Sequence, residues 1–250
     1  MVVMKNNRTL IISLIAIVAL FIGAVIFVPQ LAKTSGESGQ ISAPDLSKYN
    51  LNGLIAATED NGNIADHVKG DITTAEVVLY EYADYQCTAC ATFNPWIKEL
   101  IKEYDGKLAI VFRLYPITSL HPNGIAAASA VEAAGLQGYW EEMGDLLFAN
   151  QAEWYYSTGS NRTNYFISYF QSASKGEGDV AKFKEDMAGN TVKSKVNFDK
   201  AIAEKLGLTY TPAFLDSDGN ELDFTKDDTE QTKSGIMNFF RSHIDAKLSK

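Results

Sequence analysis

The sequence predicts an α/β fold with an inserted helical subdomain, preceded by one N-terminal transmembrane helix. An almost continuous apolar run lies near the N-terminus of the 250-residue chain. Further along, two apolar runs rich in β-formers flank an amphipathic helical pattern, and a long helical region separates them from a last β-rich run. A strand, a helix and a strand in this order form a βαβ unit with parallel strands.

The first element is the apolar run at residues 10–28, which contains only one serine and one glycine among apolar residues. At a rise of about 1.5 Å per residue it is long enough to cross the hydrocarbon core of a bilayer. Lys5 and Arg8 precede the run. This charge bias predicts that residues 1–9 are cytoplasmic and that the rest of the chain is extracytoplasmic, attached to the cell membrane.

A cleaved signal peptide is the alternative interpretation of this run. The apolar part of a signal peptide is usually ~7–15 residues long and ends in a small-x-small cleavage site. Here the run is longer, and its exit at residues 28–33 reads Val-Pro-Gln-Leu-Ala-Lys, a poor match to that site. We therefore expect an uncleaved anchor. With either interpretation the body of the protein faces a compartment in which disulfides persist.

Residues 29–50 are expected to form a flexible linker, because they contain Ser, Gly and Lys and show no apolar periodicity. The folded domain is then expected to span residues 51–250. Within it, Leu51 to Ala57 is the first candidate for a strand, at an edge of the sheet.

The centre of the domain is the predicted βαβ unit. Glu76 to Ala83 is apolar without polar alternation, which is typical of a strand that is buried on both faces. The following segment places Phe93, Ile97 and Leu100 on one face of a helix. Leu108 to Leu114 is a second buried strand. Open α/β sheets hold their chemistry at the carboxyl ends of such strands.

The remaining elements are an inserted helical subdomain at about residues 118–207 and a C-terminal part. Alanine-rich and amphipathic patterns predict helices at Ala126–Ala134, Tyr139–Phe148, Asn164–Phe170, Val180–Met187 and Val196–Leu206. After the insertion, an Asp-Gly turn signal within Ala213 to Phe224 predicts a β-hairpin. An amphipathic helix that carries Ile236, Phe240 and Ile244 closes the chain.

Cys87 and Cys90 are the only cysteines of the sequence, and they lie between a predicted strand and a predicted helix. In this context a Cys-x-x-Cys pair indicates a redox dithiol. The free N–H groups and the dipole of a helix N-terminus favour the thiolate of Cys87, which is the attacking species in disulfide exchange. Cys90 lies one turn further, where it can attack a mixed disulfide and release the substrate.

Other classes of site are less well supported by the composition. A structural disulfide without turnover is the alternative for the cysteine pair. A zinc site is not expected, because there is no second cysteine pair and His67, His121 and His243 are scattered. The net charge of -9 argues against a nucleic-acid partner, since phosphates call for a basic face.

Residues 81–90, Glu-Tyr-Ala-Asp-Tyr-Gln-Cys-Thr-Ala-Cys, resemble the active site of the DsbA-like thiol:disulfide oxidoreductases, a branch of the thioredoxin superfamily. The membrane-tethered members of that branch are the most similar. The resemblance runs from about Val68 to the C-terminus and implies a thioredoxin-like fold with a helical insertion. Its other local matches are Pro95, Leu120-His121-Pro122, Leu147 to Gln151, and Thr211-Pro212.

The resemblance implies roles for further residues. Pro212 would be the cis-proline that faces the dithiol, and Thr211 would offer backbone groups to an extended substrate segment. An ordinary trans proline at the start of a strand is the alternative. Glu81 matches a buried acidic residue that relays protons to Cys90, although a solvent-exposed carboxylate at a strand end fits equally well. We expect Asp84 to be more exposed and structural.

The sequence departs from the strongly oxidising relatives at Thr88-Ala89, where they carry Pro-His. A histidine that would help to stabilise the thiolate is therefore missing, and the oxidising strength stays open. Redox potentials in this superfamily range from about -270 to -120 mV.

We expect an extracytoplasmic thiol:disulfide oxidoreductase that introduces disulfides into reduced secreted or surface proteins. The resemblance implies a membrane partner of the DsbB or VKOR type, linked to quinone, that reoxidises the dithiol. No bound cofactor is needed, because the dithiol itself carries the electrons. The alternatives are a reductase or isomerase on the same fold, a tethered binding or chaperone module with a structural disulfide, and metal carriage.

Overall fold

The computed structural model describes residues 42–226 and 229–250, which belong to one compact unit spanning residues 41–250. The predicted transmembrane run at residues 10–28 lies outside the described residues. No helix in the described part of the chain has the length and apolar character needed to span a bilayer.

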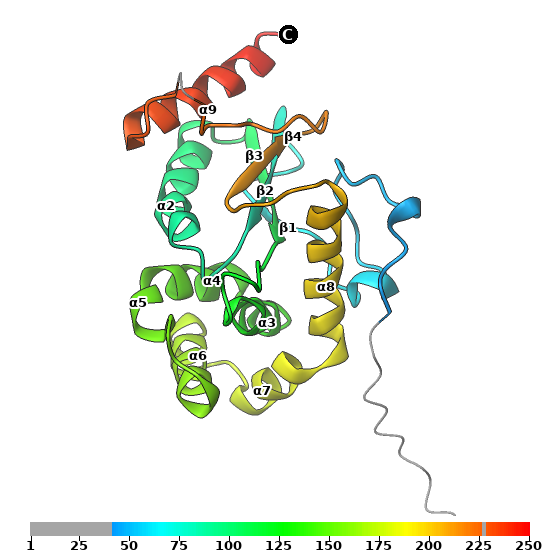
Figure 1. The fold of residues 1–250 in the computed structure, drawn as a ribbon, viewed down its shortest axis with the longest axis vertical. Coiled ribbons are helices and arrows are strands. Elements are labelled where there is room, and N and C mark those ends of the chain that lie inside the picture. Colours follow the sequence, from blue (N-terminus) through cyan, green and yellow to red (C-terminus); the bar gives the residue numbers. More distant parts are fainter. Residues whose placement is uncertain (1–41, 227–228) are drawn as a thin grey trace, which may run out of the picture. The chain divides into compact units, whose positions relative to one another are not determined.

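A four-stranded sheet in the order β1-β3-β2-β4 forms the centre of this unit (Figure 1). The edge strands β1 (His67–Lys69) and β4 (Ala213–Asp216) run antiparallel to their neighbours. β2 (Val77–Ala83) and β3 (Leu108–Leu114) are parallel, and α2 (Thr88–Glu103) connects them. The predicted βαβ unit is therefore confirmed.

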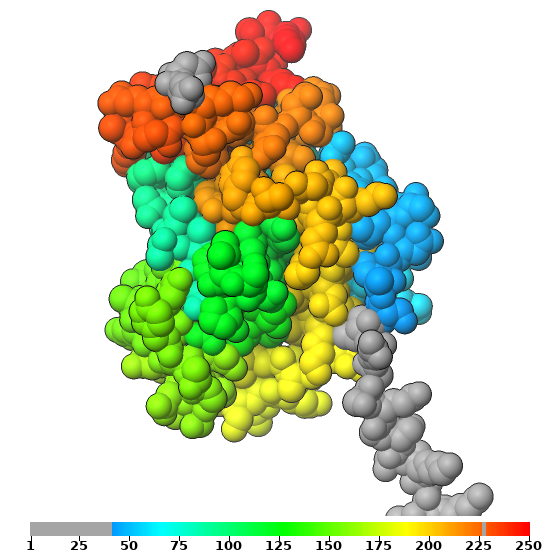
Figure 2. All heavy atoms as spheres, in the orientation of Figure 1, coloured from blue at the N-terminus to red at the C-terminus, as the bar shows by residue number. Residues whose placement is uncertain are grey.

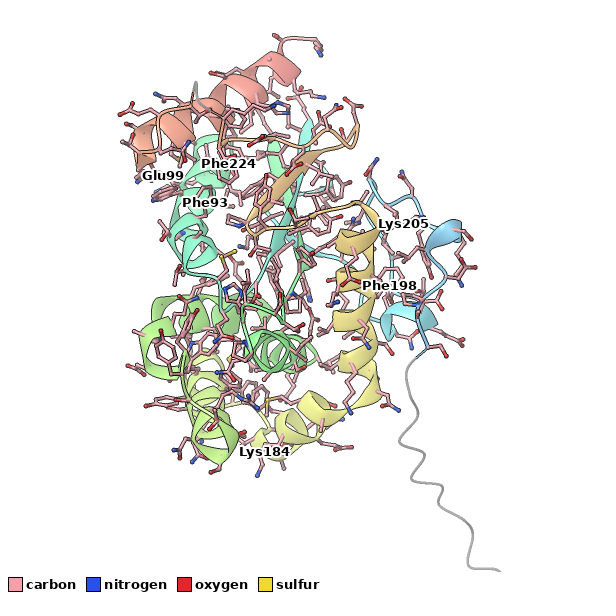
Figure 3. The ribbon with its side chains drawn as sticks, in the orientation of Figure 1. Phe93, Glu99, Lys184, Phe198, Lys205 and Phe224 are labelled. Atoms are coloured by element: carbon pink, nitrogen blue, oxygen red, sulfur yellow. The ribbon has the colours of Figure 1, made fainter. Side chains whose placement is uncertain are left out.

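Helices cover both faces of the sheet. α2 and α9 (Lys233–Leu248) pack on one face, where the rings of Phe93 and Phe224 lie 4.9 Å apart. α8 (Asn190–Lys205) packs on the other face through Phe198. Figure 3 labels these three phenylalanines on their two sides of the sheet. Because both faces are covered, β2 and β3 lack the polar alternation of a half-exposed strand.

The helical insertion lies beside the carboxyl ends of β2 and β3 (Figure 1). Before α8 it contains α3 (Gly124–Gly135), α4 (Trp140–Ala149), α5 (Gln151–Trp154), α6 (Gly159–Ala173) and α7 (Val180–Ala188). The predicted helices are thus present, and the short α5 is added to them. Alanines of α3 are buried against the neighbouring helices, and the rings of Phe170 and Phe183 stack at 4.3 Å.

The start of the domain differs from the expectation. The last residues of the predicted linker fold onto the domain: Asp45 caps a short 3-10 helix, η1 (Leu46–Lys48), and the ring of Tyr49 meets that of Phe198 edge-on at 5.0 Å. Figure 2 shows this N-terminal segment, in blue, against α8. Apolar burial of Tyr49 therefore extends the domain toward the N-terminus beyond the predicted boundary at residue 51.

The strand expected at Leu51–Ala57 is wrong, because a buried cluster of charges satisfies the backbone there. Arg113 donates to two carbonyl oxygens of this segment, at 2.5 and 2.7 Å, and pairs with Asp66 at 2.8 Å. Asp66 also accepts a backbone N–H of the segment at 2.9 Å. Lys195 extends the cluster, at 3.4 Å from Asp66 and 2.8 Å from Asp199. Side chains thus replace the strand pairing that these groups would otherwise need.

The hairpin expected over Ala213 to Phe224 is reduced to β4 and one isolated bridge between Leu215 and Glu221. The Asp-Gly turn is present, and Gly219 adopts a φ of +83°. The carboxylate of Asp216 accepts backbone N–H groups of the turn, so the turn is held by a side chain and the second strand is not extended.

Replacement of Asp66 tests the buried charge cluster. Asp66→Asn removes the carboxylate from two buried cations, so we expect the free energy of unfolding to fall by about 3–5 kcal/mol, measured by urea denaturation. Burial alone would raise the pKa of Asp66, but Lys195 and Arg113 outweigh it and hold that pKa below its ordinary value. The stabilisation is therefore lost as the pH falls through the folded-state pKa, and the Asn variant lacks this acid-sensitive part.

The matched control is Glu99→Gln, which breaks a half-exposed ion pair with Lys233. The free energy of unfolding of this variant is expected to fall by less than about 1 kcal/mol. An equal effect of the two substitutions would contradict the assignment of Asp66 to a stabilising buried network.

Candidate active site

Cys87 is the N-cap residue of α2 and follows β2 closely in the chain. Its sulfur accepts the backbone N–H of Cys90 at 3.4 Å, which closes the first turn of the helix. The predicted position of the pair at a helix N-terminus is confirmed. Both cysteines are free thiols, and Cys87 is 6% exposed whereas Cys90 is fully buried. Only the sulfur of Cys87 is therefore within reach of a second protein.

The two thiols differ in pKa. The hydrogen bond with the Cys90 side chain outweighs burial and lowers the pKa of Cys87 to about 6, assisted by Thr211 and by backbone N–H groups of the first turn. Burial raises the pKa of Cys90 well above its ordinary value, and the neighbouring Cys87 raises it further. At neutral pH the outer sulfur is thus mainly a thiolate and the inner sulfur a thiol, the state from which disulfide exchange begins.

Thr211 and Pro212 lie opposite Cys87, as expected, and the bond between them is cis. The thiol of Cys87 donates to the carbonyl oxygen of Thr211 at 3.2 Å. The pairing of Tyr82 with Ala213 in the β2–β4 ladder places this loop beside the cysteine. The backbone of Thr211 therefore lies next to the reactive sulfur, where an extended segment of another protein can pair with it.

Glu81 is buried beneath the dithiol, with 1% of its surface exposed, which decides between the two environments left open by the sequence. Burial raises the pKa of Glu81, and Lys69, at 3.8 Å, opposes that rise. Its Oε2 atom has no hydrogen-bond partner among the described residues. Burial thus favours the protonated form of this carboxyl group more than exposure to water would.

A chain of polar side chains connects Glu81 with the surface. Lys69 donates to Asn94 at 2.9 Å, and Asn94 donates to Asp145 at 2.9 Å. Asp145 is about one-third exposed and is also bound by Lys98. A cavity of about 10 Å³ lies along this route, close to the size of one water molecule. Glu81 therefore lies at the inner end of a row of polar side chains whose outer member, Asp145, reaches the solvent.

Asp84 is fully enclosed, so the expectation that it is exposed is wrong. Its carboxylate accepts the backbone N–H groups of Gln86 and Ile117, each at 2.9 Å, and lies 2.7 Å from Nδ1 of His121. A Cβ atom on Gly124 would approach it to 2.9 Å, so that glycine leaves room for it. The structural role expected for Asp84 agrees with these contacts.

His121 is a functional candidate that the sequence did not single out. The hydrogen bond with Asp84 raises the pKa of His121, and the negative charge on Cys87 contributes to the same rise. A histidine near Cys87 is therefore supplied from the start of the insertion, although Thr88-Ala89 carries none, and its raised pKa favours the charged imidazolium. The Leu120-His121-Pro122 motif is the sequence signal that could have identified it.

Two glutamines hold the backbone of the site. Gln151 of α5 donates to the carbonyl oxygens of Tyr85 and Cys87 at 2.9 and 3.1 Å. Gln86 accepts the N–H of Asn123 at 2.6 Å and donates to a carbonyl of the insertion at 2.8 Å. Both glutamines belong to stretches that carry the family resemblance, but their spacing in the sequence does not show which backbone groups they bind.

The other histidines lie in separate environments. His67 stacks on Trp140 with ring centroids 4.4 Å apart. His243, on α9, lies near Asp216 of β4. Within residues 42–226 and 229–250, no group of three His, Cys, Asp or Glu side chains is arranged to hold a metal ion.

Comparison with known proteins identifies a family. A family model described as Thioredoxin matches residues 63–233. The chain is also 34% identical over 150 residues to the Na(+)/H(+) antiporter NhaA 3 of Salinispora tropica, and 33% identical over 150 residues to NhaA 1 of Salinispora arenicola, in each case over 60% of this chain. The match covers only 21% of each antiporter, so the chain spans about a fifth of the length of these relatives.

Solved structures share the fold. BdbD from Bacillus subtilis in its oxidised form superposes with a TM-score of 0.58 at 17% identity, over 79% of this chain and 98% of that one. Wolbachia pipientis alpha-DsbA1 superposes with a TM-score of 0.54 at 23% identity, over 74% of this chain and 91% of that one. A thioredoxin-like oxidoreductase from Silicibacter pomeroyi DSS-3 superposes with a TM-score of 0.53 at 21% identity, over 76% of this chain and 99% of that one. At these identities the likeness establishes the fold.

Substitution of His121 tests its effect on the thiolate. His121→Asn removes the positive charge and leaves Asp84 uncompensated, so we expect the pKa of Cys87 to rise from about 6 by up to ~1 unit. The measurement is a pH titration of the ultraviolet absorbance of the thiolate. His243→Asn, on the distant α9, is the control and should leave the titration unchanged. An unchanged titration in the His121 variant would show that this residue only positions Asp84.

Proposed function

This chain belongs to the thioredoxin family. On that premise we propose that it is a DsbA-like thiol:disulfide oxidoreductase that introduces disulfides into secreted or surface proteins outside the cytoplasm. The observation that carries the proposal is the Cys87 sulfur, which is stabilised as a thiolate at the N-terminus of α2 beside Thr211 and above the buried Cys90. The outer sulfur exchanges with substrate, and the inner sulfur completes the enzyme disulfide.

The proposed reaction begins with the Cys87–Cys90 disulfide and a substrate dithiol. A substrate thiolate attacks the sulfur of Cys87, and the bond to Cys90 breaks. Cys90 leaves with the electron pair and takes a proton, for which Glu81 is the proposed donor. A second substrate thiolate then attacks the substrate sulfur of the mixed disulfide and expels Cys87 as a thiolate. Two electrons have passed from substrate to enzyme, and no other redox group takes part.

The thiolate of Cys87 favours the oxidising direction by a limited amount. With a pKa of about 6 for Cys87, the reduced enzyme is stabilised at pH 7 by about 1.4 kcal/mol relative to one with an unshifted thiol. This stabilisation raises the reduction potential by about 30 mV. Potentials in this superfamily span about 150 mV between thioredoxin and DsbA. The stabilisation therefore supports oxidation and corresponds to about a fifth of that range.

The proposal includes a location and a partner. The apolar run at residues 10–28 would anchor the enzyme in the cell membrane, with its catalytic domain extracytoplasmic. Each turnover leaves a dithiol, so a further oxidant has to restore the disulfide. A membrane protein of the DsbB or VKOR type, linked to quinone, is the proposed partner. Thr211 and Pro212 would hold the substrate segment while the sulfurs exchange.

The redox equilibrium of the dithiol tests this proposal. We expect Cys87–Cys90 to equilibrate with a glutathione buffer at a potential above that of thioredoxin, about -270 mV. Wild-type protein should oxidise a reduced model protein, and Cys87→Ser should abolish that activity. Cys90→Ser keeps the Cys87 nucleophile, so with oxidised glutathione it should accumulate a mixed disulfide, because the Cys87 thiolate displaces one glutathione thiolate and no second cysteine can release the other.

Other outcomes would favour the rival functions. A potential at or below the thioredoxin value, together with reduction of substrate disulfides, would favour a reductase or isomerase. Full activity of Cys87→Ser would contradict an enzymatic role and favour a binding module with a structural disulfide.

Glu81→Gln tests the proposed proton transfer. The amide cannot donate a proton to Cys90, so we expect the rate of substrate oxidation to fall by roughly 100-fold, the lower end for general acid–base catalysis. The pH dependence attributable to Glu81 should disappear, which a merely structural role would not produce. The exposed Glu76, next to β2, provides the control Glu76→Gln. An unchanged rate and pH profile in Glu81→Gln would exclude the relay.

A further inference from the structure

The outer side of the helical insertion carries a groove that the disulfide chemistry does not use. Its volume is about 590 Å³, within the range of ligand sites. It is formed by α3, α6, α7 and α8, and begins at Pro122, next to His121 of the active site. Apolar side chains and three cations line it, namely Ile125, Phe166 and Met187 with Arg162, Lys184 and Lys193.

The cations of this groove have no acidic partner in the described part of the chain. Arg162 binds only the amide oxygen of Asn123, at 2.7 Å. The nearest acidic residues in the sequence, Glu185 and Asp186, are held by Lys182 at 3.8 and 2.6 Å. A basic groove in a chain with a net charge of -9 is therefore a local feature and not a consequence of composition.

The groove is connected to the dithiol through hydrogen bonds. Gln86, the residue before Cys87, accepts the N–H of Asn123 at 2.6 Å. The side chain of Asn123 in turn accepts from Arg162. Leu120, two residues before Pro122 in the sequence, is 65% exposed.

We propose that this groove binds an acidic segment with apolar side chains in the protein substrate whose cysteines Cys87 oxidises. The inference rests on the proposed function and adds a substrate class to it. Carboxylates would pair with Arg162, Lys184 and Lys193, and an apolar side chain would lie on Ile125 and Met187. Opposite charge raises the rate of encounter and fixes the orientation of the segment.

The arrangement favours a peptide over a single phosphate group, such as a lipid headgroup. Arg162, Lys184 and Lys193 come from three different helices around an apolar floor. Phosphate groups are usually held by cations and N–H groups that converge on one point. An extended chain with several carboxylates matches cations that are distributed along a groove.

The experiment compares two peptides that share one dicysteine core. A Gly/Ser spacer of about eight residues, which spans up to ~26 Å, connects the core to Glu-Leu-Glu-Phe-Glu or to the same sequence with Gln for Glu. We expect the wild-type kcat/KM to be about five- to tenfold higher for the acidic peptide, mainly through KM, as three exposed ion pairs allow. The preference should decrease with rising salt.

Charge-reversal variants test whether the preference for the acidic peptide depends on the groove. Lys184→Glu combined with Lys193→Glu should remove the preference and leave kcat/KM for the Gln peptide unchanged. Lys205→Glu is the matched control, because it makes the same kind of change on α8 about 18 Å along the helix from Lys193. Figure 3 shows Lys184 and Lys205 in different parts of the domain. The control should keep the preference.

Binding of a cysteine-free acidic peptide, measured by fluorescence anisotropy, separates the groove from the chemistry. Failure to oxidise either peptide, with binding that the double variant loses, would overturn the proposed function and retain the groove. Equal kcat/KM for the two peptides, or a preference that survives the double variant, would overturn the groove. Binding only to vesicles that contain phosphatidylglycerol, lost in the double variant, would assign it to lipid instead.

Discussion

The position of the Cys87 sulfur at the first turn of α2 is the constraint on which the site depends. The chain passes from β2 into this helix within a few residues, so the sulfur lies at the carboxyl end of the parallel pair. The Tyr82–Ala213 register then places Thr211 against it. Cys90 falls one turn inside the helix, where it is buried. This one geometry sets both the difference in exposure and the difference in pKa between the sulfurs.

The helical insertion belongs to this site as well as to the scaffold. It supplies His121, which Asp84 holds near the thiolate, and Gln151, which binds the carbonyl of Cys87. The pKa of His121 is raised there, so this residue is a candidate for the electrostatic role that a histidine between the cysteines would have. On the outer side of the same helices, the groove at Arg162 extends the recognition surface away from the sulfur.

Two buried carboxylates show how the number of partners decides a role. Asp66 lies between Arg113 and Lys195, and its pKa is held low despite burial, so it remains charged and stabilises the fold. Within the described part of the chain, Glu81 faces one cation, Lys69 at 3.8 Å, and burial raises its pKa. A carboxyl group with one distant cation can exchange a proton, whereas one with two close cations cannot do so without a large loss of stability.

The amino-acid sequence by itself determined the elements and the location of the dithiol. Apolar runs and 3.6-residue periodicity are local properties, so β2, α2, β3 and the helices of the insertion could be predicted, together with Cys87 at a helix N-terminus. Family resemblance added Thr211-Pro212. The tertiary structure alone decided that Glu81 and Asp84 are buried and that His121 meets Asp84, because those contacts depend on the path of the chain between distant residues. For the same reason Leu51 to Ala57 forms no strand: its backbone groups are bound by Arg113 and Asp66, which no local pattern reveals.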